Sequence, residues 1–431
     1  MSGFTILSPL NPSANTCGYC GPPGQRSTEE TSYHSAECIP MQLSCQDYQA
    51  MIDRGWRRSG TYCYKPDLKR SCCPQYTIKY ASLFHDVCPR RVSGNYFIGT
   101  FEAALGDEIT YIVSPYRFNR WVLHGDDHQG SGTKHKGKDN QPSKLEEAIH
   151  ASELEHCAST SGPEPAHKFQ VTLEPASYTD EKFALYQIYQ RDIHKEQEKK
   201  PQSFRRFLVE NNLHREDIPY ATSPPSHLPH HYGAYHQLYR LDGELIAMGV
   251  IDILPSCVSS VYFMYNSKWD RFSLGKLSAL REASIAREMH AAGAPGMQYL
   301  YMGFYIYSCQ KMRYKGEYSP SFLADPEDYT WHPLEECKPL LEQYRYACFS
   351  HPEHSIEEDY IGEDHNPQLS HNDLKDVNVV ISVQDRRAII APVEESPEWR
   401  RDSVKRAVMT TVDALGPTLA KRVILYFVYG P

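Results

Sequence analysis

Apolar and polar positions along the chain divide its middle part into strands. Between residues 233 and 265, three extended runs, AYHQLYRL, ELIAMGVIDIL and CVSSVYFMY, are separated by Asp242-Gly243 and by Pro255-Ser256. Asp-Gly favours a two-residue hairpin turn, and the runs are rich in aromatic and β-branched residues, which favour strands. The segment therefore predicts an antiparallel meander of three strands.

Apolar residues at helical spacing predict helices on both sides of this meander. Phe183, Tyr186 and Tyr189 recur on one face of the segment 180–198, which favours an amphipathic helix that packs on the core. We expect helices at residues 41–54, 180–198, 203–211 and 276–291, and one or two more within the last fifty residues. We expect further strands at residues 56–64, 76–80, 111–123, 168–174, 297–305, 377–383 and 388–392.

The order of these elements predicts a mixed α/β (α+β) fold. A meander, then a helix that follows a small loop, then another strand, is the order of acetyltransferase-like (GNAT) domains, in which two central strands splay apart around an acyl donor. Residues 125–167 are rich in Gly, Ser, Lys, Glu and His, which favours a flexible insertion or linker. We expect a cysteine-rich N-terminal domain at 1–124, this insertion at 125–167, a GNAT-like domain at 168–350, and a C-terminal extension at 351–431 packed on one of the two domains.

Length and charge restrict the class of protein. The chain has 431 residues, enough for two or three domains, and a formal net charge of −9 at pH 7. This charge excludes a generally basic nucleic-acid coat but leaves room for a local RNA-binding patch. The start, MSGFTILSPLNPSANT, lacks a basic region followed by a long apolar run, and no other run is long enough to span a bilayer. We therefore expect no membrane partner, and a location in the cytoplasm and also in the nucleus.

Positive charge is concentrated between residues 54 and 91. This segment contains nine Lys or Arg residues and two acidic residues, which gives a local charge of +7 in an acidic chain. The interspersed tyrosines have rings that can stack on bases: Tyr62, Tyr64, Tyr76 and Tyr80. The predicted RNA-binding residues are Arg54, Arg57, Arg58, Lys65, Lys69, Arg70, Lys79, Arg90 and Arg91. The alternative is a solvated surface with scattered charges. A second basic group can extend the patch: Lys199, Lys200, Arg205 and Arg206.

Two cysteine pairs near the start of the chain point to a metal centre. Eight of the 13 cysteines precede residue 89, and they include Cys17-Gly18-Tyr19-Cys20 and the adjacent pair Cys72-Cys73. Four thiolates from two tight turns can close around one metal ion or cluster. The alternative is two unrelated thiol pairs, or one disulfide across the loop between them. The other early cysteines form no close pair and are weaker candidates: Cys38, Cys45, Cys63 and Cys88.

Three parts of the chain resemble the arginyl-tRNA–protein transferases. They are the run from Tyr235 to Tyr262, which contains GVIDILP, the run YIYSCQKMRYKG from Tyr305 to Gly316, and the two cysteine motifs CGYCG and SCCPQY. The resemblance covers roughly residues 15–90 and 180–335, more than half of the chain.

This resemblance implies an enzyme that transfers arginine from arginyl-tRNA to the α-amine of proteins with N-terminal Asp, Glu or oxidised Cys. The product is marked for ubiquitin-dependent degradation in the N-degron pathway, so components of that ubiquitin-ligase pathway are further partners. The resemblance also implies a GNAT-like catalytic domain. It implies an iron–sulfur cluster, for which we favour 4Fe–4S, at Cys17, Cys20, Cys72 and Cys73, with zinc at the same thiolates as the alternative. We expect no nucleotide cofactor.

The reaction requires a cation for the acidic residue of the acceptor protein. An aminoacyl ester is already activated, so the enzyme needs to position a neutral amine and stabilise an oxyanion. Lys311, Arg313 and Lys315 alternate with other residues and would share one face of a strand. We expect at least one of them to pair with the acidic residue; the alternative is a solvated basic edge or contact with RNA phosphate. His236 is a second candidate, and its alternative is a hydrogen-bonded core histidine.

The arginine side chain requires a carboxylate. Asp252 lies inside the apolar run VIDIL, where an unpaired charge is costly, so we expect it to bind arginine. The alternative is an internal ion pair with Arg281 or Lys276, and Glu282 is a weaker candidate for the arginine site. The catalytic candidates are therefore Asp252, His236 and Tyr262, and the substrate-binding candidates are Lys311, Arg313, Lys315, Gln237, Ser260 and Glu282.

Three other functions are compatible with these motifs. A leucyl-tRNA–protein transferase would keep the fold but need an apolar pocket instead of a carboxylate. A non-catalytic tRNA-binding metalloprotein would keep the basic patch and the cysteines. An acyl-CoA acetyltransferase would need a Gly-rich turn that cradles a pyrophosphate before the helix, and Ser273-Leu274-Gly275-Lys276-Leu277 matches such a turn poorly.

Overall fold

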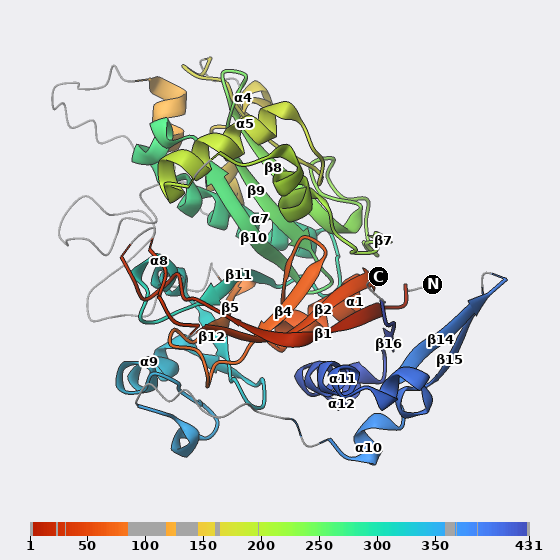
Figure 1. Cartoon of the computed structure of the whole chain (residues 1–431). Coiled ribbons are helices and arrows are strands. Elements are labelled where there is room, and N and C mark those ends of the chain that lie inside the picture. The colour runs from red at the N-terminus through yellow and green to blue at the C-terminus, as the bar shows by residue number, and fades with distance from the viewer. Residues whose placement is uncertain are drawn as a thin grey trace.

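The computed structural model describes residues 3–22, 25–30, 32–84, 118–125, 145–159, 164–196, 198–357, 367, 369–385 and 387–428. Within these residues the strands form two sheets, and helices pack on both of them (Figure 1). The first sheet contains, in spatial order, β15 (Arg387–Pro392), β14 (Asn378–Gln384), β16 (Ile424–Leu425), β1 (Ile6–Asn15), β2 (Ser32–Gln42), β4 (Tyr62–Pro66) and β3 (Arg57–Ser59). The second contains β13 (Trp331–Pro333), β12 (Ser321–Ala324), β5 (Tyr76–Ala81), β11 (Tyr299–Tyr305), β10 (Cys257–Tyr265), β9 (Glu244–Ile253), β8 (His231–Leu241) and β6 (Phe169–Pro175), with β7 (Glu216–Asp217) beside β8.

Helices connect and cover these strands. Their bounds are α1 (Cys45–Asp53), α3 (Leu145–His150), α4 (Leu154–Ser159), α5 (Asp180–Tyr189), α6 (Pro201–Phe204), α7 (Leu274–Ala291), α8 (Gln310–Arg313), α9 (Leu334–Gln343), α10 (His371–Leu374), α11 (Asp402–Leu415) and α12 (Pro417–Ala420). None of the helices in the described ranges is long and apolar enough to cross a membrane.

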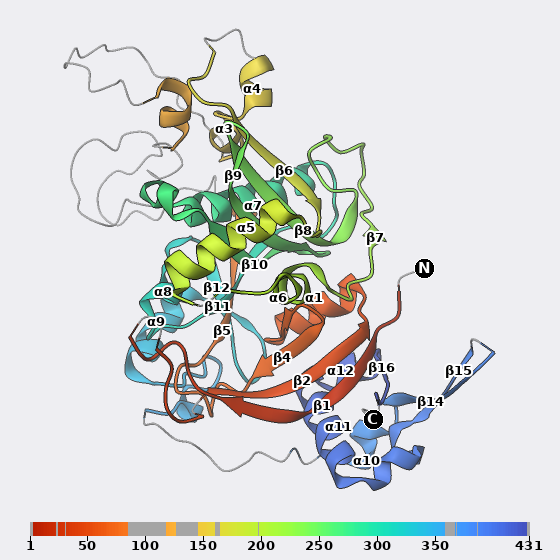
Figure 2. The ribbon, with the colours of Figure 1, turned by 45° about the horizontal axis from the view of Figure 1, so that its top comes forward.

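The predicted three-stranded meander is confirmed. Strands β8, β9 and β10 pair antiparallel, and Asp242 and Gly243 form the turn between β8 and β9 with positive φ angles of 52° and 87°. Helix α7 follows β10 and leads to β11, which runs parallel to β10. The two parallel strands pair only from Cys257 to Ser259 on β10, so their later residues lack a shared ladder. Helices α5 and α7 cover opposite faces of this sheet (Figure 2).

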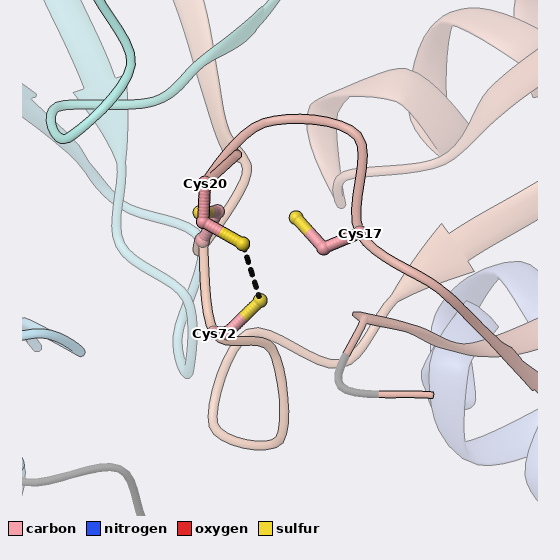
Figure 3. A group of neighbouring side chains, drawn as sticks. Cys17, Cys20 and Cys72 are labelled. Atoms are coloured by element: carbon pink, nitrogen blue, oxygen red, sulfur yellow. Dashed lines mark hydrogen bonds between the residues drawn. The ribbon is translucent and has the colours of Figure 1, made fainter. Parts of the chain in front are cut away.

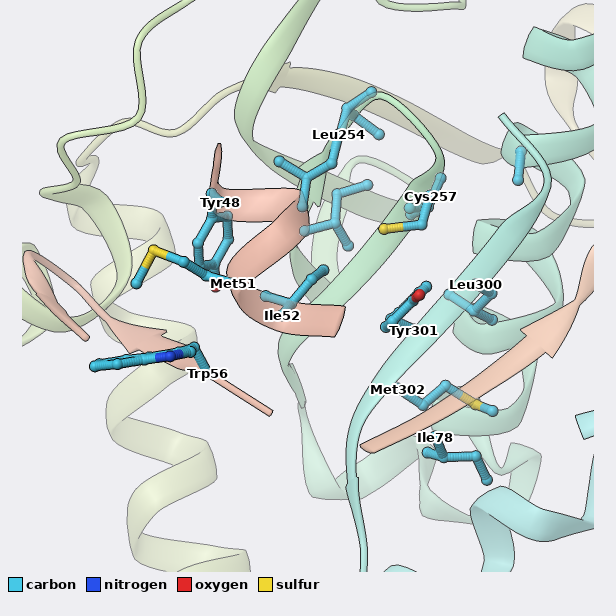
Figure 4. Packing of buried hydrophobic residues seen from close by; sticks show 14 of the residues in the cluster. Tyr48, Met51, Ile52, Trp56, Ile78, Leu254, Cys257, Leu300, Tyr301 and Met302 are labelled. Carbon is cyan, nitrogen blue, oxygen red and sulfur yellow. The ribbon is translucent and has the colours of Figure 1, made fainter. Parts of the chain in front are cut away.

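The N-terminal region belongs to both sheets. Its strands β1 to β4 form the first sheet, whereas β5 lies between β11 and β12 in the second sheet. Helix α1 packs its buried face, which includes Tyr48, Met51 and Ile52, against residues of β9 to β11 (Figure 4). The second sheet therefore contains strands from both sides of residues 125–167, the segment that we expected to separate two domains.

The C-terminal residues complete the first sheet. Strand β16 runs parallel to β1 on one side and to β14 on the other, and helix α11 covers β1 and β2 (Figure 1). The Trp56 indole Nε1 donates a hydrogen bond to the Ala414 carbonyl at 3.2 Å, which ties this helix to the N-terminal region. The described residues after 369 thus belong to the N-terminal sheet or pack on it.

Three local predictions differ from the structure for identifiable reasons. The helix predicted at 41–54 begins at Cys45, because β2 continues to Gln42 and the Ser44 hydroxyl caps the helix by accepting from the Asp47 amide. Within the strand predicted at 111–123, residues 118–124 are helical, with Phe118, Trp121 and Val122 at helical spacing; residues 111–117 lie outside the described residues. The segment from Lys311 to Lys315 is helical, so its three cations do not share the face of a strand.

The described part of the predicted insertion at 125–167 is docked on the core. Helix α3 packs against α7, where the Glu146 carboxylate accepts from the Arg287 guanidinium at 2.5 Å. Glu153, just after α3, pairs with Arg281 of α7. Two acidic side chains of the predicted insertion, Glu146 and Glu153, are therefore partners of buried arginines of α7.

Candidate active site and cysteine centre

The four predicted cysteine ligands come together in space. The Sγ atoms of Cys17, Cys20, Cys72 and Cys73 all lie within 4.8 Å of one another. Figure 3 shows the Cys17–Cys20 turn facing Cys72, with the Cys20 and Cys72 sulfurs 4.0 Å apart. Cys17 and Cys73 are buried, whereas Cys20 is exposed at the rim. We call these four residues the cysteine centre.

The cysteine centre fits a metal ion or cluster. Its donors are four sulfurs from two short turns, which is the ligand set of structural zinc sites and of iron–sulfur clusters. The Tyr19 amide donates to the Cys17 sulfur at 3.3 Å, and hydrogen bonds from the Cys72 and Cys73 thiols lower the pKa of Cys17. The same thiol contacts raise the pKa of Cys73, so among these two buried sulfurs negative charge is favoured on Cys17. Cys38 and Cys63 instead face each other across β2 and β4, away from this centre.

The cysteine centre packs directly against the segment after β11. Cys17 and Cys73 share a small apolar cluster with Ile306 and Cys309, and Met312 borders it. The Ser308 hydroxyl lies 3.8 Å from the Cys73 sulfur. The two cysteine turns therefore support the segment that carries Lys311 and Arg313.

The three cations of this segment have different environments. Lys311 and Arg313 are exposed, and the Arg313 guanidinium lies 5.6 Å from the centre of the Tyr307 ring. The Lys315 ammonium turns inward and donates to the Phe304 carbonyl at 2.7 Å, and burial lowers its pKa to about 7. Two of the three predicted cations, Lys311 and Arg313, thus lie at the surface.

Asp252 forms a buried ion pair with Arg58. The Arg58 guanidinium donates to both Asp252 oxygens, at 2.8 and 2.5 Å, and the two side chains are 3% and 0% exposed. Burial alone would lower the pKa of Arg58, but the Asp252 carboxylate raises it. An internal ion pair was the expected alternative for Asp252, but its partner is neither Arg281 nor Lys276. It comes from β3, 194 residues away.

His236 is a core residue. It is fully buried, its Nε2 lies 2.9 Å from the Leu208 carbonyl, and its Nδ1 lies 3.1 Å from the Lys182 ammonium. Burial lowers its pKa to about 4, so the ring is neutral at physiological pH. In this structure His236 cannot contact an acidic substrate side chain, and the alternative of a hydrogen-bonded core histidine describes its position.

Glu282 is buried and pairs with no cationic side chain in the part of the chain that the structure describes. It lies on α7 and is 1% exposed, and the Ser278 hydroxyl donates to its Oε1 at 2.8 Å. Its Oε2 is buried and has no hydrogen-bond partner within the described residues. Burial raises the pKa of Glu282 to about 7, while hydrogen bonds from Ser278 and Ser260 oppose the rise. Ser260 comes from β10, beside the unpaired part of the parallel strands.

Gln237 and Tyr262 lie on different sides of the sheet. Gln237 pairs with Gly249 and accepts a hydrogen bond from Tyr239 on the α7 face, near Ser278. A β-bulge between Ser260 and Tyr262 turns the Tyr262 ring toward the α5 face, where its hydroxyl accepts from the Gln190 amide at 2.9 Å. Burial raises the pKa of this hydroxyl. Tyr262 is therefore separated by the sheet from the Glu282 carboxylate.

The predicted basic patch is divided between interior and surface. Three of its residues are buried: Arg57, Arg58 and Lys79. Arg57 donates to the carbonyls of Ile52, Trp56 and Gly303, and Lys79 lies over the rings of Tyr299 and Trp331. These three residues are not available to RNA in this structure, contrary to our prediction, because each fills a position inside a sheet. Tyr76 and Tyr80 are buried as well, and Arg90 and Arg91 lie outside the described residues.

The other four patch residues line one groove. Arg54, Lys65, Lys69 and Arg70 border a cavity of about 1150 Å³ between the first sheet, the loop after β12 and helix α11. The groove also has acidic lining residues: Asp67, Asp325, Glu327, Asp373 and Asp413. Lys69 pairs with Glu327 at 2.6 Å, and burial lowers the pKa of Lys65 to about 7. The groove therefore carries charges of both signs.

Sequence reasoning missed the role of Arg58 and the isolation of Glu282. Arg57 and Arg58 are adjacent in a run expected to be a strand, where neighbouring side chains point to opposite faces; this alternation was the available signal that one of them faces the interior. In the second basic group, Lys199 pairs with Glu196, and the Arg205 guanidinium lies 3.5 Å from the Tyr178 ring centre.

Two family models match this chain, and several proteins of known name are similar to it. A family model described as "Arginine-tRNA-protein transferase, C terminus" matches residues 181–325, and one described as "Arginine-tRNA-protein transferase, N terminus" matches residues 15–84. "Arginyl-tRNA--protein transferase 1" of Drosophila melanogaster is 32% identical, over 80% of this chain and 85% of the fly protein. The protein of the same name from Arabidopsis thaliana is 29% identical, over 78% of this chain and 74% of the plant protein. An "Aspartate/glutamate leucyltransferase" of Pseudomonas fluorescens is 31% identical, over 35% of this chain and 55% of the bacterial protein.

The geometry of the cysteine centre predicts that Cys17, Cys20, Cys72 and Cys73 hold the metal. The double variant Cys17→Ser/Cys72→Ser should lose most of the bound metal, because each turn then supplies only one thiolate. Iron, zinc and acid-labile sulfide measured on protein prepared without oxygen check this. Cys157→Ser, a half-buried cysteine outside the centre, is the matched control and should keep the metal. Equal metal content in both proteins would contradict the assignment.

Proposed function

Because the chain belongs to the arginyl-tRNA–protein transferase family and transfers arginine from tRNA to proteins, we propose that its acceptors carry N-terminal Asp, Glu or oxidised Cys. The observation that carries this proposal is the exposed pair Lys311 and Arg313 on the segment supported by the cysteine centre. Either cation can pair with a carboxylate or sulfonate, and Arg can do so bidentately. The arginylated product then enters the ubiquitin-dependent N-degron pathway, in the cytoplasm and the nucleus.

We further propose that the second sheet is a GNAT-like catalytic domain. What supports this is the order β8, β9, β10, α7 and β11, together with the parallel pairing of β10 and β11 over Cys257–Ser259 alone. Backbone amides beyond the paired residues are then available to the aminoacyl end of tRNA. Such amides can stabilise the oxyanion that develops on the ester carbonyl.

The reaction needs no covalent enzyme intermediate. The neutral α-amine of the acceptor attacks the ester carbonyl carbon, an amide C–N bond forms, and the ester C–O bond to the terminal ribose breaks. The proton lost by the amine ends on the ribose hydroxyl that leaves. An α-amine titrates near pH 8, so the acceptor amine needs no strong general base to lose its proton. Positioning this amine against the ester carbonyl therefore contributes more to the rate than a strong base would.

Glu282 is our candidate for the carboxylate that binds the arginine side chain. Asp252 is already neutralised by Arg58, whereas the partners of Glu282 are hydroxyls and its Oε2 has no hydrogen-bond partner within the described residues. A guanidinium is the group that would offset the desolvation of such a carboxylate. Glu282 therefore takes the role for which the sequence favoured Asp252.

We propose that the groove bordered by Arg54, Lys65, Lys69 and Arg70 receives the tRNA backbone. These four cations lie on one surface, and Lys69 and Arg70 immediately precede the second cysteine turn. Phosphates would compete with Glu327 for Lys69, so binding should weaken with added salt.

We propose that the cysteine centre holds an iron–sulfur cluster of the 4Fe–4S type, with zinc as the alternative. The donor set of four sulfurs supports either, and Cys17, Cys20, Cys72 and Cys73 would be the ligands. When bound, the cluster would supply a redox-active iron centre. The residues around it keep the segment with Lys311 and Arg313 in place by packing Ile306, Cys309 and Met312 against the two turns.

A second candidate function is transfer of leucine rather than arginine. The partial match to an aspartate/glutamate leucyltransferase favours it. A leucine pocket would be apolar, whereas Glu282 introduces a carboxyl group beside Ser260, just beyond the paired residues of β10. We therefore rank arginine first.

The acceptor specificity can be measured with peptides that differ only in their first residue. Arginyl-tRNA and leucyl-tRNA, each with a labelled amino acid, are offered to peptides beginning with Asp, Glu, cysteine sulfonate or Ala. We expect arginine transfer to the three acidic peptides and none to Ala, because only the acidic side chains can pair with Lys311 or Arg313. Transfer to Ala at the same rate would contradict the proposed acceptors, and transfer of leucine alone would favour the second function.

The role of Glu282 predicts a pH-dependent defect. Glu282→Gln should reduce kcat/KM for arginyl-tRNA roughly ten- to hundredfold, the loss expected for one charge-assisted hydrogen bond. Because the pKa of Glu282 is raised to about 7, the carboxylate forms only as the pH rises through that value. The ratio of wild-type to variant rates should therefore increase with pH across neutrality.

Glu317→Gln is the matched control for this measurement. Glu317 is an exposed carboxylate that pairs with Lys276 beside the same helix, and its variant should behave like the wild type. A Glu282→Gln enzyme with the wild-type rate at all pH values would remove Glu282 from the arginine site.

A further inference from the structure

A group of metal-ligating side chains outside the cysteine centre includes one residue of α7. His150 at the end of α3, His227 in the loop before β8, and Glu288 of α7 come from three separate segments. Their ligand atoms all lie within 4.8 Å of one another. His150 Nε2 is 3.1 Å from Glu288 Oε1, and His227 Nε2 is 2.5 Å from Glu288 Oε2. Two imidazoles thus present the same kind of nitrogen to one carboxylate.

The hydrogen-bonding capacity of His150 does not match its surroundings. Its Nδ1 is 2.9 Å from Glu153 Oε2, and its Nε2 faces Glu288, so both ring nitrogens face carboxylates. A neutral imidazole has one N–H and donates to only one of them. The other contact then sets a nitrogen lone pair against a carboxylate oxygen. Either a second proton or a cation between Nε2 and Glu288 removes this conflict.

We infer that His150, His227 and Glu288 form a second metal site, separate from the cysteine centre, that binds a divalent transition ion such as Zn²⁺. Two imidazole nitrogens and one carboxylate are the protein ligands of many zinc sites and suit other borderline divalent ions as well. The ion replaces the missing proton at His150 Nε2, while Nδ1–H donates to Glu153.

The residues around this group orient its ligands. Glu153 is itself held by Arg281 of α7, so the carboxylate that accepts from His150 Nδ1 is fixed in place. The Ser284 hydroxyl donates to Glu288 Oε1 at 2.7 Å. A carboxylate behind a metal-binding imidazole, and a hydroxyl behind a metal-binding carboxylate, are the usual supports of a zinc ligand set.

The site joins three parts of the fold. The ion would fasten α3, from the segment at 125–167, and the loop before β8 to α7 (Figure 2). Glu288 is on the same helix as Glu282, so the metal would stabilise the helix that carries our candidate for the arginine site.

The test compares zinc binding by the full-length wild type and by His227→Ala. His227 is 39% exposed, so its removal should leave the fold intact. His230→Ala is the control, because His230 is an exposed histidine three residues away in the same loop. After chelation, each protein is titrated with Co²⁺ and Zn²⁺. Sulfur-to-cobalt charge transfer reports the cysteine centre, and d–d bands without charge transfer report a nitrogen and oxygen site.

The wild type and His230→Ala should bind one more metal ion per chain than His227→Ala, and zinc should raise their melting temperature. The charge-transfer signal should be the same in all three proteins. Glu288→Gln is the second variant and should lose the same ion. Equal metal content in the wild type and in all three variants would overturn the proposal. A melting temperature that responds to acid but not to zinc would overturn it as well, because a proton rather than a metal ion would then lie between His150 and Glu288.

Discussion

The buried ion pair between Arg58 and Asp252 connects the two sheets. Arg58 lies on β3 of the first sheet, and Asp252 lies on β9, an interior strand of the second. Neither side chain is accessible to water, so each charge depends on the other for its solvation, and loss of one partner leaves an unpaired charge in the core. The apolar face of α1 packs in the same core cluster as residues of both sheets.

This constraint also determines how the chemical groups are arranged. Strand β5 follows the second cysteine turn and enters the second sheet next to β11, and β11 leads into the segment that packs on the cysteine centre. The cysteine centre, the exposed cations Lys311 and Arg313, and the parallel strands beside Glu282 are therefore connected through the pairing of β5 with β11. Binding of a metal or cluster at the cysteines would stabilise the same segment that, in our proposal, binds the acceptor protein.

Local patterns in the sequence predicted local structure. The meander of β8 to β10, helix α7 and the cysteine centre follow from turn residues, periodicity and ligand spacing over short distances. The pairing of Asp252 with Arg58 could not be predicted in this way, because the partners are 194 residues apart and Arg58 belongs to a run whose charge indicated a surface. The alternation of Lys311, Arg313 and Lys315 fits a strand or a short helix equally well, and packing against the cysteine centre decides between them. From the sequence, Glu282 was the weaker candidate for the arginine site. The sequence does not show that Arg58 already neutralises Asp252 and leaves Glu282 as a buried carboxyl group without a cation in the described residues.

A double-mutant cycle on Arg58 and Asp252 tests most directly whether this pair is structural. Asp252→Asn alone should destabilise the protein by about 3–5 kcal/mol in denaturant unfolding, because Arg58 remains charged and buried. The double variant Arg58→Met/Asp252→Asn should recover a large part of this loss and should still transfer arginine at a temperature where it is folded. A double variant that is stable but no longer transfers arginine would contradict the account, because Asp252 would then be a ligand of the substrate.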